Sequence, residues 1–166
     1  MSVRFGIGTV LTAILVSGFA SAAHAEAASA AGPFAAMHGA WSGGGSYTSS
    51  FGEREALRCR ATYQTGSGGH TLQFTLRCAS QGTNIVLGGN VQHRAGAVSG
   101  TWSESTRGVN GRVDGRAQGN RIVVRASSDF FAASLALTTR DNKQAILIRP
   151  EGGQFGVVSV SLSKGR

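Results

Sequence analysis

The residue types that carry catalysis and metal binding are few in this sequence and widely spaced. His38, His70 and His93 stand apart in the chain, which is typical of surface or turn residues rather than of a ligand set. Glu53 and Glu55 lie two apart, so on a strand they share a face and have the spacing of paired carboxylates. However, arginines flank this pair, and the alternative is that both carboxylates are solvated near a loop and have no catalytic role.

Sequence motifs of known catalytic sites are also missing. The chain has no G-x-S-x-G elbow, no H-E-x-x-H, no phosphate-binding G-x-x-x-x-G-K-[ST] and no EF-hand loop. We therefore expect a protein that is not an enzyme, with no catalytic residues, no metal and no cofactor. The search for function then moves to the elements that position the remaining side chains.

The two cysteines define one hairpin. Gly68-Gly69 is typical of a two-residue hairpin turn, and folding the chain about it pairs residues whose numbers sum to 137. Cys59 then faces Cys78, with Cα atoms about 4.5 to 5.5 Å apart, a separation that a disulfide accepts. Apolar and polar residues alternate on the same register. We predict one structural disulfide, Cys59 to Cys78.

Further turn signals predict more hairpins of the same kind. Turns at Ala95-Gly96, Gly119-Asn120 and Asp141-Asn142 are expected to pair Trp102 with Gly89, Val113 with Ala126, Asp114 with Arg125, Leu137 with Ile146 and Leu135 with Ile148. A three-residue connection near Phe51-Gly52-Glu53 is expected to place Tyr47 opposite Leu57 and Trp41 opposite Tyr63.

The whole pattern predicts an all-β fold. Its 25 glycines and 2 prolines in 166 residues argue against helices, since glycine costs about 1 kcal/mol in a helix interior relative to alanine. About ten short strands joined by tight turns favour an up-and-down antiparallel β-barrel of about 8–10 strands. A β-sandwich is the alternative. We expect residues 39–166 to form a single β-barrel domain.

The first 25 residues have the three parts of a secretory signal. Arg4 is followed by an apolar stretch from Thr9 to about Ala20, and Ala23-His24-Ala25 is a small-x-small cleavage site; Ala20-Ser21-Ala22 is an alternative one. Residues 26–38 are predicted to be a flexible leader with a short helical turn at Pro33 to His38. These features predict a periplasmic or secreted protein with no transmembrane span in its mature form.

The formal net charge of +8 comes from 16 basic and 8 acidic residues. In an exported protein such a charge points to anionic lipid or polysaccharide as a partner. Nucleic acid is not expected, because basic and aromatic residues do not interleave. Polar strand faces carry the candidate anion-binding residues: Arg58, Arg60, Arg77, Arg112, Arg116 and Arg125. The alternative is that these arginines solvate the outside of the barrel.

The inward face combines large aromatic residues with glycines. Its candidate ligand-lining residues are Trp41, Tyr47, Tyr63, Phe74, Trp102 and Phe131. Inward positions also hold Gly43, Gly45, Gly89, Gly100, Gly111 and Gly115, which contribute no volume. They either leave a cavity for an apolar ligand or make room for the two Trp rings.

The segment from Pro33-Phe34 to His38, followed by Gly39-Ala40-Trp41, resembles the opening of lipocalin-type (calycin-type) barrels. There a short helical turn precedes a G-x-W motif whose Trp closes the barrel floor. The resemblance implies a secreted barrel that holds small hydrophobic molecules, with Gly39 and Trp41 structural. The later T-D-Y-type segment and the C-terminal helix of that family are missing, and no basic residue is assigned to pack on the Trp.

The chain is also similar in plan to small periplasmic protease-inhibitor barrels, which have a signal peptide, an early G-x-W and one disulfide. There the inhibitory piece is the N-terminal segment, here Glu26 to His38. Three functions therefore remain open. The first is an exported, non-enzymatic barrel that binds a small apolar or amphiphilic ligand in the cell envelope. The others are a module that binds and inhibits an exported protease, and an envelope protein that binds a polyanion.

Overall fold

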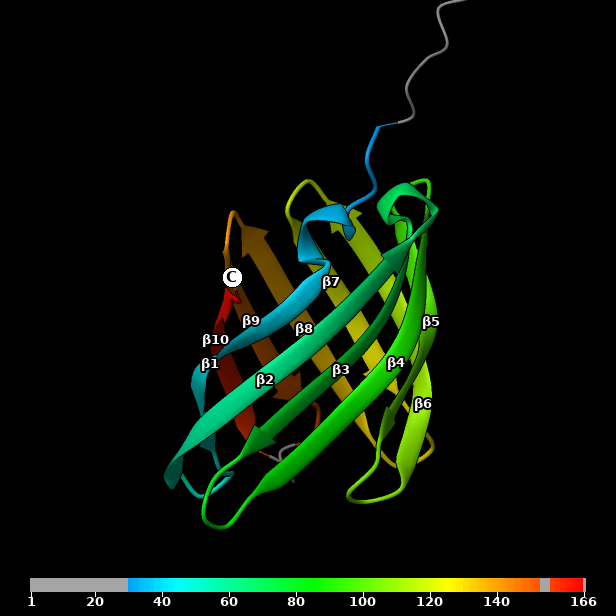
Figure 1. The fold of residues 1–166 in the computed structure, drawn as a ribbon. Helices are drawn as coiled ribbons and strands as arrows, with labels where there is room; N and C mark the ends of the chain where they lie inside the picture. The colour runs from blue at the N-terminus through cyan, green and yellow to red at the C-terminus, as the bar shows by residue number, and fades with distance from the viewer. Residues whose placement is uncertain (1–29, 153–155, 166) are drawn as a thin grey trace, which may run out of the picture.

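Ten antiparallel strands wind around one axis in the computed structural model of the chain, which describes residues 30–152 and 156–165 (Figure 1). A 3₁₀ helix, η1 (Ala35–Met37), precedes the first strand, and a second, η2 (Ser67–Gly69), forms one of the turns. The strands are β1 (Gly39–Thr48), β2 (Arg54–Gly66), β3 (Thr71–Ala79), β4 (Asn84–Arg94), β5 (Ala97–Glu104), β6 (Val109–Gln118), β7 (Arg121–Ser127), β8 (Ala132–Arg140), β9 (Lys143–Pro150) and β10 (Val157–Lys164).

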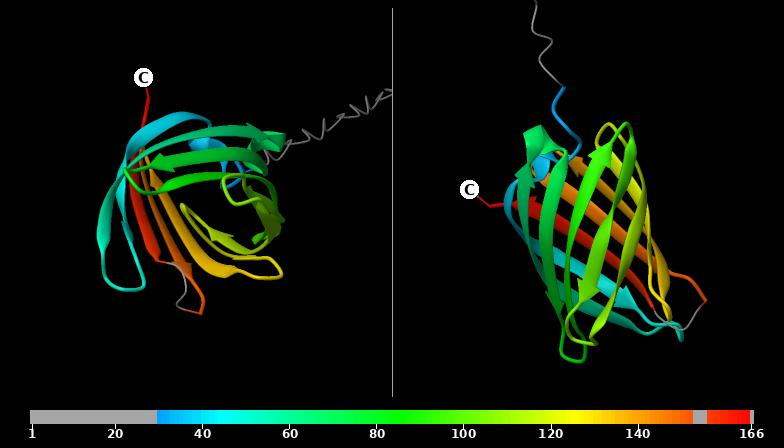
Figure 2. Two further views of the ribbon diagram at one scale, coloured as in Figure 1. Left: turned by 90° about the horizontal axis from the view of Figure 1, so that it is seen from below. Right: turned by 90° about the vertical axis from the view of Figure 1, so that its right-hand side faces the viewer.

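Each strand pairs with the next one along the chain, and β1 pairs with β10 to close the ring. Figure 2 shows the strands tilted against the barrel axis. The predicted up-and-down antiparallel barrel is confirmed, with ten strands where about 8–10 were predicted. Closure excludes the sandwich and leaves no unpaired sheet edge. The predicted signal peptide, and the leader up to residue 29, lie outside the described residues.

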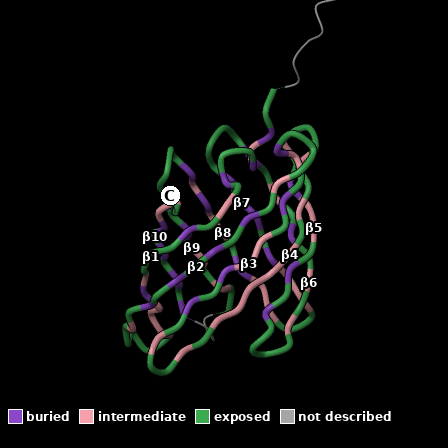
Figure 3. The backbone as a smooth tube through the Cα atoms, viewed as in Figure 1, coloured by how far each residue is buried: buried purple, intermediate pink, exposed green. Residues whose placement is uncertain are grey.

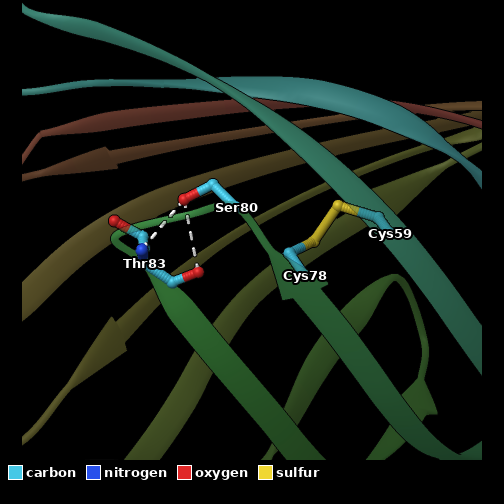
Figure 4. The surroundings of a disulfide bond; sticks show 4 residues. All are labelled: Cys59, Cys78, Ser80 and Thr83. Atoms are coloured by element: carbon cyan, nitrogen blue, oxygen red, sulfur yellow. Dashed lines mark hydrogen bonds between the residues drawn. A yellow bond between two sulfur atoms is a disulfide. The ribbon is translucent and has the colours of Figure 1, made fainter.

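The hairpin registers predicted from the two-residue turns are confirmed. Cys59 faces Cys78 in the β2–β3 pair, and the two form the disulfide shown in Figure 4. Beyond it the Ser80 hydroxyl accepts a hydrogen bond from the backbone N–H of Thr83 at 2.9 Å, which closes the β3–β4 turn. The pairs predicted about the other turns also occur: Trp102 with Gly89, Val113 with Ala126, Asp114 with Arg125, Leu137 with Ile146 and Leu135 with Ile148.

The predicted register of β1 against β2 is wrong by two residues. Tyr47 faces Glu55, and Trp41 faces Ala61. The connection between the two strands runs from Ser49 to Glu53, and a Ser49–Glu53 pair within it leaves residues 50–52 as the turn, one residue earlier than the predicted 51–53. The Ser49 N–H donates to the Glu53 carbonyl at 2.8 Å, while the Ser49 hydroxyl accepts from the Glu53 N–H at 3.1 Å. A two-residue shift keeps every side chain on its predicted face.

Alternate residues of the strands face the barrel interior. Along β2 buried and exposed positions follow one another (Figure 3), with Leu57, Cys59, Ala61 and Tyr63 no more than 3% exposed. The disulfide is therefore inside the barrel wall, and the interior is apolar.

The inward glycines are places where neighbouring strands come close together. A Cβ at Gly43 would fall on the backbone carbonyl of Ser161, and one at Gly115 on that of Val123. The other four approach a carbonyl of an adjacent strand in the same way: Gly45, Gly89, Gly100 and Gly111. The space that a side chain would occupy is thus taken by backbone, as at the tight bends of small barrels. At Gly111 a Cβ would also stand 2.9 Å from Nε1 of Trp102, which agrees with the alternative that such glycines make room for a Trp ring.

One end of the barrel, the upper end in Figure 1, is closed by the segment that precedes β1. Phe34 and Met37 are each 1% exposed, and the Phe34 N–H donates to the carbonyl of Gly69 in the β2–β3 turn at 3.0 Å. The short helical turn predicted at Pro33 to His38 is present as η1. We call residues 32–38 the plug, and the end that they close the plugged end.

Candidate functional site

A cavity of about 290 Å³ lies inside the barrel, between the plug and the loops at the opposite end. Phe34 and Met37 of the plug form its inner boundary. Arg107, Phe130 and Pro150 line it at the opposite end, which we call the mouth. The strands supply the wall, because their inward positions carry branched and aromatic side chains. None of the six inward glycines borders the cavity.

Five of the six aromatic residues singled out in the sequence border this cavity: Tyr47, Tyr63, Phe74, Trp102 and Phe131. Trp41 does not border it. Its indole lies under the plug, where Nε1 donates to the Met37 carbonyl at 2.7 Å and the ring meets the edge of Tyr63 at 6.3 Å between centroids. Whether the other five contact a ligand stays a prediction.

Much of the wall was not singled out beforehand. Leu135 and Leu137 of β8, with Ile146 and Ile148 of β9, line one side of the cavity. The predicted β8–β9 hairpin had already placed them opposite one another on one face. The alternation of inward and outward positions along the strands would have identified these four residues. They were missed because only aromatic residues were considered as candidates for the lining.

The hydroxyl of Tyr63 is the polar group near the plugged end, and it already has a partner. It donates to Oε1 of Gln144 at 2.6 Å, and Nε2 of Gln144 donates to the Thr139 hydroxyl at 3.1 Å. Burial raises the pKa of Tyr63 well above its usual value, and the hydrogen bond to Gln144 offsets only part of this effect. Tyr63 is thus a neutral, satisfied member of the wall.

The indole of Trp102 differs in this respect. The residue is 7% exposed, and its Nε1 donor has no hydrogen-bond acceptor among the described residues. The ring meets the edge of Phe131 at 5.7 Å between centroids, and both residues border the cavity. Buried donors without an acceptor are rare in proteins. The Trp102 nitrogen has less than 1 Å² of exposed surface, so it is packed into the barrel wall beside Gly111 and is not open to the cavity.

A charged pair stands at the mouth. Glu104 accepts hydrogen bonds from the backbone N–H groups of Val86, Thr106 and Arg107 at 2.8–3.0 Å, and the Arg107 guanidinium lies 3.4 Å from its Oε2. Burial acts to raise the pKa of Glu104, but these hydrogen bonds together outweigh it and hold the pKa below its usual value. The carboxylate is ionised and fully engaged, and it fixes the β5–β6 loop beside the cavity.

The candidate anion-binding arginines fall into two groups on different sides of the barrel, separated by β4 and β5. Arg60 and Arg77 are direct neighbours on β2 and β3. Arg58 lies further along β2, while Arg112 and Arg116 are exposed on β6. Arg125 already has an anionic partner, because its guanidinium binds both carboxylate oxygens of Glu151, at 2.9 and 2.8 Å. The structure does not bring the six together.

Two of the histidines are not isolated, contrary to the interpretation from spacing. Nδ1 of His70 and Nδ1 of His93 are 2.9 Å apart, and the rings stack with centroids 5.2 Å apart. Nε2 of His93 accepts from the Gly96 N–H at 3.1 Å, so the proton between the two rings belongs to His93.

Of the paired glutamates, Glu55 accepts from the Ser80 hydroxyl.

Among residues 30–152 and 156–165, no helix has the length and apolar character needed to cross a lipid bilayer.

Comparison with known proteins identifies the fold and nothing finer. No family model and no curated protein sequence matches the chain. The crystal structure of Rv2717c from M. tuberculosis superposes with a TM-score of 0.60 at 13% identity, covering 79% of this chain and 94% of that one. The S-type phycobiliprotein lyase CPES from Guillardia theta is similar at a TM-score of 0.47 and 12% identity, covering 80% and 90%. At such identity the likeness to Rv2717c shows a shared antiparallel β-barrel fold alone.

Proposed function

We propose that this barrel is a non-enzymatic binding protein that holds one small, neutral, largely apolar molecule in its interior. The observation that carries the proposal is the cavity of about 290 Å³ walled by aliphatic and aromatic side chains. Concave apolar sites with a few placed polar groups are the usual form of small-molecule sites.

The volume sets the size of the ligand. A protein cavity of roughly 150 Å³ holds benzene, so about twice that volume suits a molecule of about ten to twelve non-hydrogen atoms. The wall sets its charge. Arg107 at the mouth already faces Glu104, and an ion deeper inside would lose its hydration without a counter-charge. The preferred ligand is therefore neutral.

Calorimetric titration with naphthalene, and with naphthalene-2-sulfonate as its anionic counterpart, tests the proposal. We expect saturable one-to-one binding of naphthalene with a negative heat-capacity change, a raised midpoint of thermal unfolding and much weaker binding of the anion. Equal binding of both probes, or none of either, would contradict it.

Two neighbouring valines of β7 supply matched variants. Val124 borders the cavity and is 7% exposed, whereas Val123 points outward and is 42% exposed. Val124→Phe fills part of the cavity and is expected to weaken naphthalene binding, while Val123→Phe adds the same ring outside and leaves the affinity unchanged. The thermal midpoint of each variant without ligand shows whether the barrel has folded.

A second candidate function, binding of an anionic envelope polymer or lipid, is favoured by the charges around the plugged end. Arg94, Arg121, Arg140 and Lys143 adjoin three of its turns and are all exposed, with Asp141 the acidic residue in those turns. This rim concentrates positive charge better than the sheet faces do. With dextran sulfate as the probe, R121Q/R140Q/K143Q should bind more weakly than R58Q/R60Q/R77Q, although both lose three charges. If both variants bind dextran sulfate equally weakly, binding depends on the net charge of the protein alone, and the rim has no specific role.

Export to the periplasm or outside the cell remains part of the proposal. The buried disulfide supports it, because disulfides persist in oxidising compartments. Inhibition of an exported protease by residues 26–38 has less support, since Phe34 and Met37 of that segment are buried in the barrel.

A further inference from the structure

Two histidines meet beside the segment that closes the plugged end. Nδ1 of His70 and Nδ1 of His93 lie 2.9 Å apart, and the rings of His93 and Phe34 meet edge to face with their centroids 6.5 Å apart. Nε2 of His93 also accepts from the Gly96 N–H at 3.1 Å. Both histidines are half-buried, whereas Phe34 is buried and borders the cavity. The histidine pair therefore links the barrel wall to the plug.

These contacts fit the two rings only when both are neutral. In that state His93 donates its proton from Nδ1 to Nδ1 of His70, which carries its own proton on Nε2. A further proton on Nδ1 of His70 would face the donor of His93, and one on Nε2 of His93 would face the Gly96 N–H. In either case two donors meet where a donor and an acceptor met before. The closed arrangement thus has no place for an added proton.

The charged and titratable groups around the pair offer an added positive charge no compensation. Around the plugged end they include the basic side chains of His38, Arg94, Arg116 and Lys164 and the acidic ones of Asp114 and Asp141. Among the described residues no carboxylate forms an ion pair or hydrogen bond with His70 or His93, whose side chains bond to one another and to Gly96. Protonation of the pair is therefore opposed for as long as the contacts persist.

The turn that leads into His70 also holds the plug. The Gly32 N–H donates to the Gly68 carbonyl at 2.9 Å, and the Phe34 N–H donates to the Gly69 carbonyl at 3.0 Å. The fit is close, since a Cβ at Gly32 would fall on the same Gly69 oxygen. Displacing either histidine ring therefore acts on the backbone contacts of the plug as well as on the packing of the Phe34 ring.

We propose that the His70–His93 pair is an acid-sensitive latch: when the pair takes up protons, the plug detaches at Phe34 and the cavity opens at the plugged end. Histidine is the side chain that ordinarily changes charge between about pH 5 and 8, so the latch acts in mild acid. The open form binds protons that the closed form excludes, and lowering the pH therefore shifts the equilibrium towards it. Opening of the plug is independent of the proposed function, whereas its effect on a bound ligand rests on that function.

Amide hydrogen exchange measures the opening of the plug without any ligand. Protection factors, which remove the intrinsic pH dependence of exchange, are compared at about pH 7.5 and about pH 5 for the N–H groups of Gly32 and Phe34 and for those in the middle of β8. We expect protection at Gly32 and Phe34 to fall by about tenfold or more in acid, because each excluded proton shifts the equilibrium up to about tenfold per pH unit. Protection in β8 should stay unchanged. Equal loss at both places would mean that the whole barrel unfolds, and no loss at the plug would equally overturn the latch.

Two variants assign the effect to the pair. His93→Gln should abolish the acid response, because an amide can both donate and accept and can therefore meet His70 in either protonation state. His38→Gln is the control, since it removes an exposed histidine of the plug that does not contact the pair, and it should respond as the wild type does. A wild-type response in His93→Gln would overturn the latch. If that variant does not fold, the wild type decides: the Gly96 amide signal must titrate with the same midpoint as the loss of protection at Phe34, and different midpoints overturn the proposal.

Naphthalene binding shows what the opening does to the cavity. The probe has no titratable group, so any pH dependence of its affinity comes from the protein. We expect its dissociation constant to rise about tenfold between about pH 7.5 and about pH 5 in the wild type and in His38→Gln, and to stay constant in His93→Gln. An unchanged affinity in the wild type despite the loss of plug protection would overturn the opening of the cavity. If naphthalene binds at neither pH while the plug opens in acid, the proposed function fails and the latch stands.

Discussion

Trp41 on β1 and Lys164 on β10 face one another across the seam where the barrel closes, with Nζ of Lys164 5.8 Å from the centre of the indole ring. Both residues also hold the plug. Trp41 donates to the Met37 carbonyl, and Lys164 donates to the Ala36 carbonyl at 3.4 Å. Lys164 is thus the basic residue that packs on Trp41, a residue that sequence spacing alone had left unassigned.

Removing the Lys164 charge should loosen this arrangement. We expect Lys164→Met to lower the free energy of unfolding by about 0.5–1 kcal/mol, the usual size of an exposed cation–π contact. Urea unfolding measures it. Lys143→Met is the control, because Lys143 donates to the Ser163 hydroxyl on the surface. An equal loss in both variants would mean that the cation contributes nothing specific at the seam.

Breaking the disulfide should destabilise the barrel without opening it. Cys59 and Cys78 close a short loop of chain with a sequence separation of 19, for which the chain-entropy model gives about 3 kcal/mol. We expect C59A/C78A to lose about that much stability in urea and to keep its naphthalene affinity, since neither cysteine borders the cavity. Reductant should lower the stability of the wild type but not that of this variant. A loss of stability in the variant would mean that reductant acts on the barrel by some route other than the disulfide.

Tyr63 should make the fold sensitive to alkali. Its pKa is raised above the ordinary value of 10.0, so above pH 10 the unfolded chain releases a proton that the folded protein retains. Stability is therefore lost as the pH rises above 10, by up to about 1.4 kcal/mol per pH unit. Urea unfolding across this range should show a weaker dependence in Tyr63→Phe than in Tyr47→Phe, and identical slopes would refute the assignment to Tyr63.

Glu104 should have the opposite dependence, in acid. Its pKa lies below the ordinary value of 4.5, so its contribution is present above that pH and is lost as the pH falls through the folded value. Glu104→Gln should cost about 1–3 kcal/mol at neutral pH, because a charged acceptor for three backbone donors is weakened. The variant should lose less further stability in acid than the wild type. Glu53→Gln, on an exposed loop, should match the wild type throughout.

Local patterns were sufficient to predict most of the barrel. Turn residues such as Gly119 and alternation along strands set hairpin registers, because an antiparallel pair is determined by its turn and by which face is apolar. The β1–β2 connection shows the limit. The hydrogen bonds between Ser49 and Glu53 centre its turn one residue earlier than predicted. The resulting shift of two residues preserves the apolar face, so the pattern could not reveal the error.

The site was less predictable because it depends on contacts between distant segments. Lys164 meets Trp41 only through the β1–β10 pairing, and His70 meets His93 only once β3 and β4 are paired. The wall residues of β8 and β9 could be predicted from the alternation of inward and outward positions along their strands. The lack of an acceptor for Trp102 Nε1 could not, because it depends on which residues surround the ring in the folded barrel.

The seam also has a consequence for the order of folding. Gly43 pairs with Leu162, residues separated by most of the chain, whereas every other strand pair is a local hairpin. Bringing such distant segments together costs the most chain entropy, so the hairpins can form early while the seam waits for β10. Until then β1 and β10 are exposed sheet edges. The interval before ring closure is the period in which the nascent protein is most open to pairing with another chain.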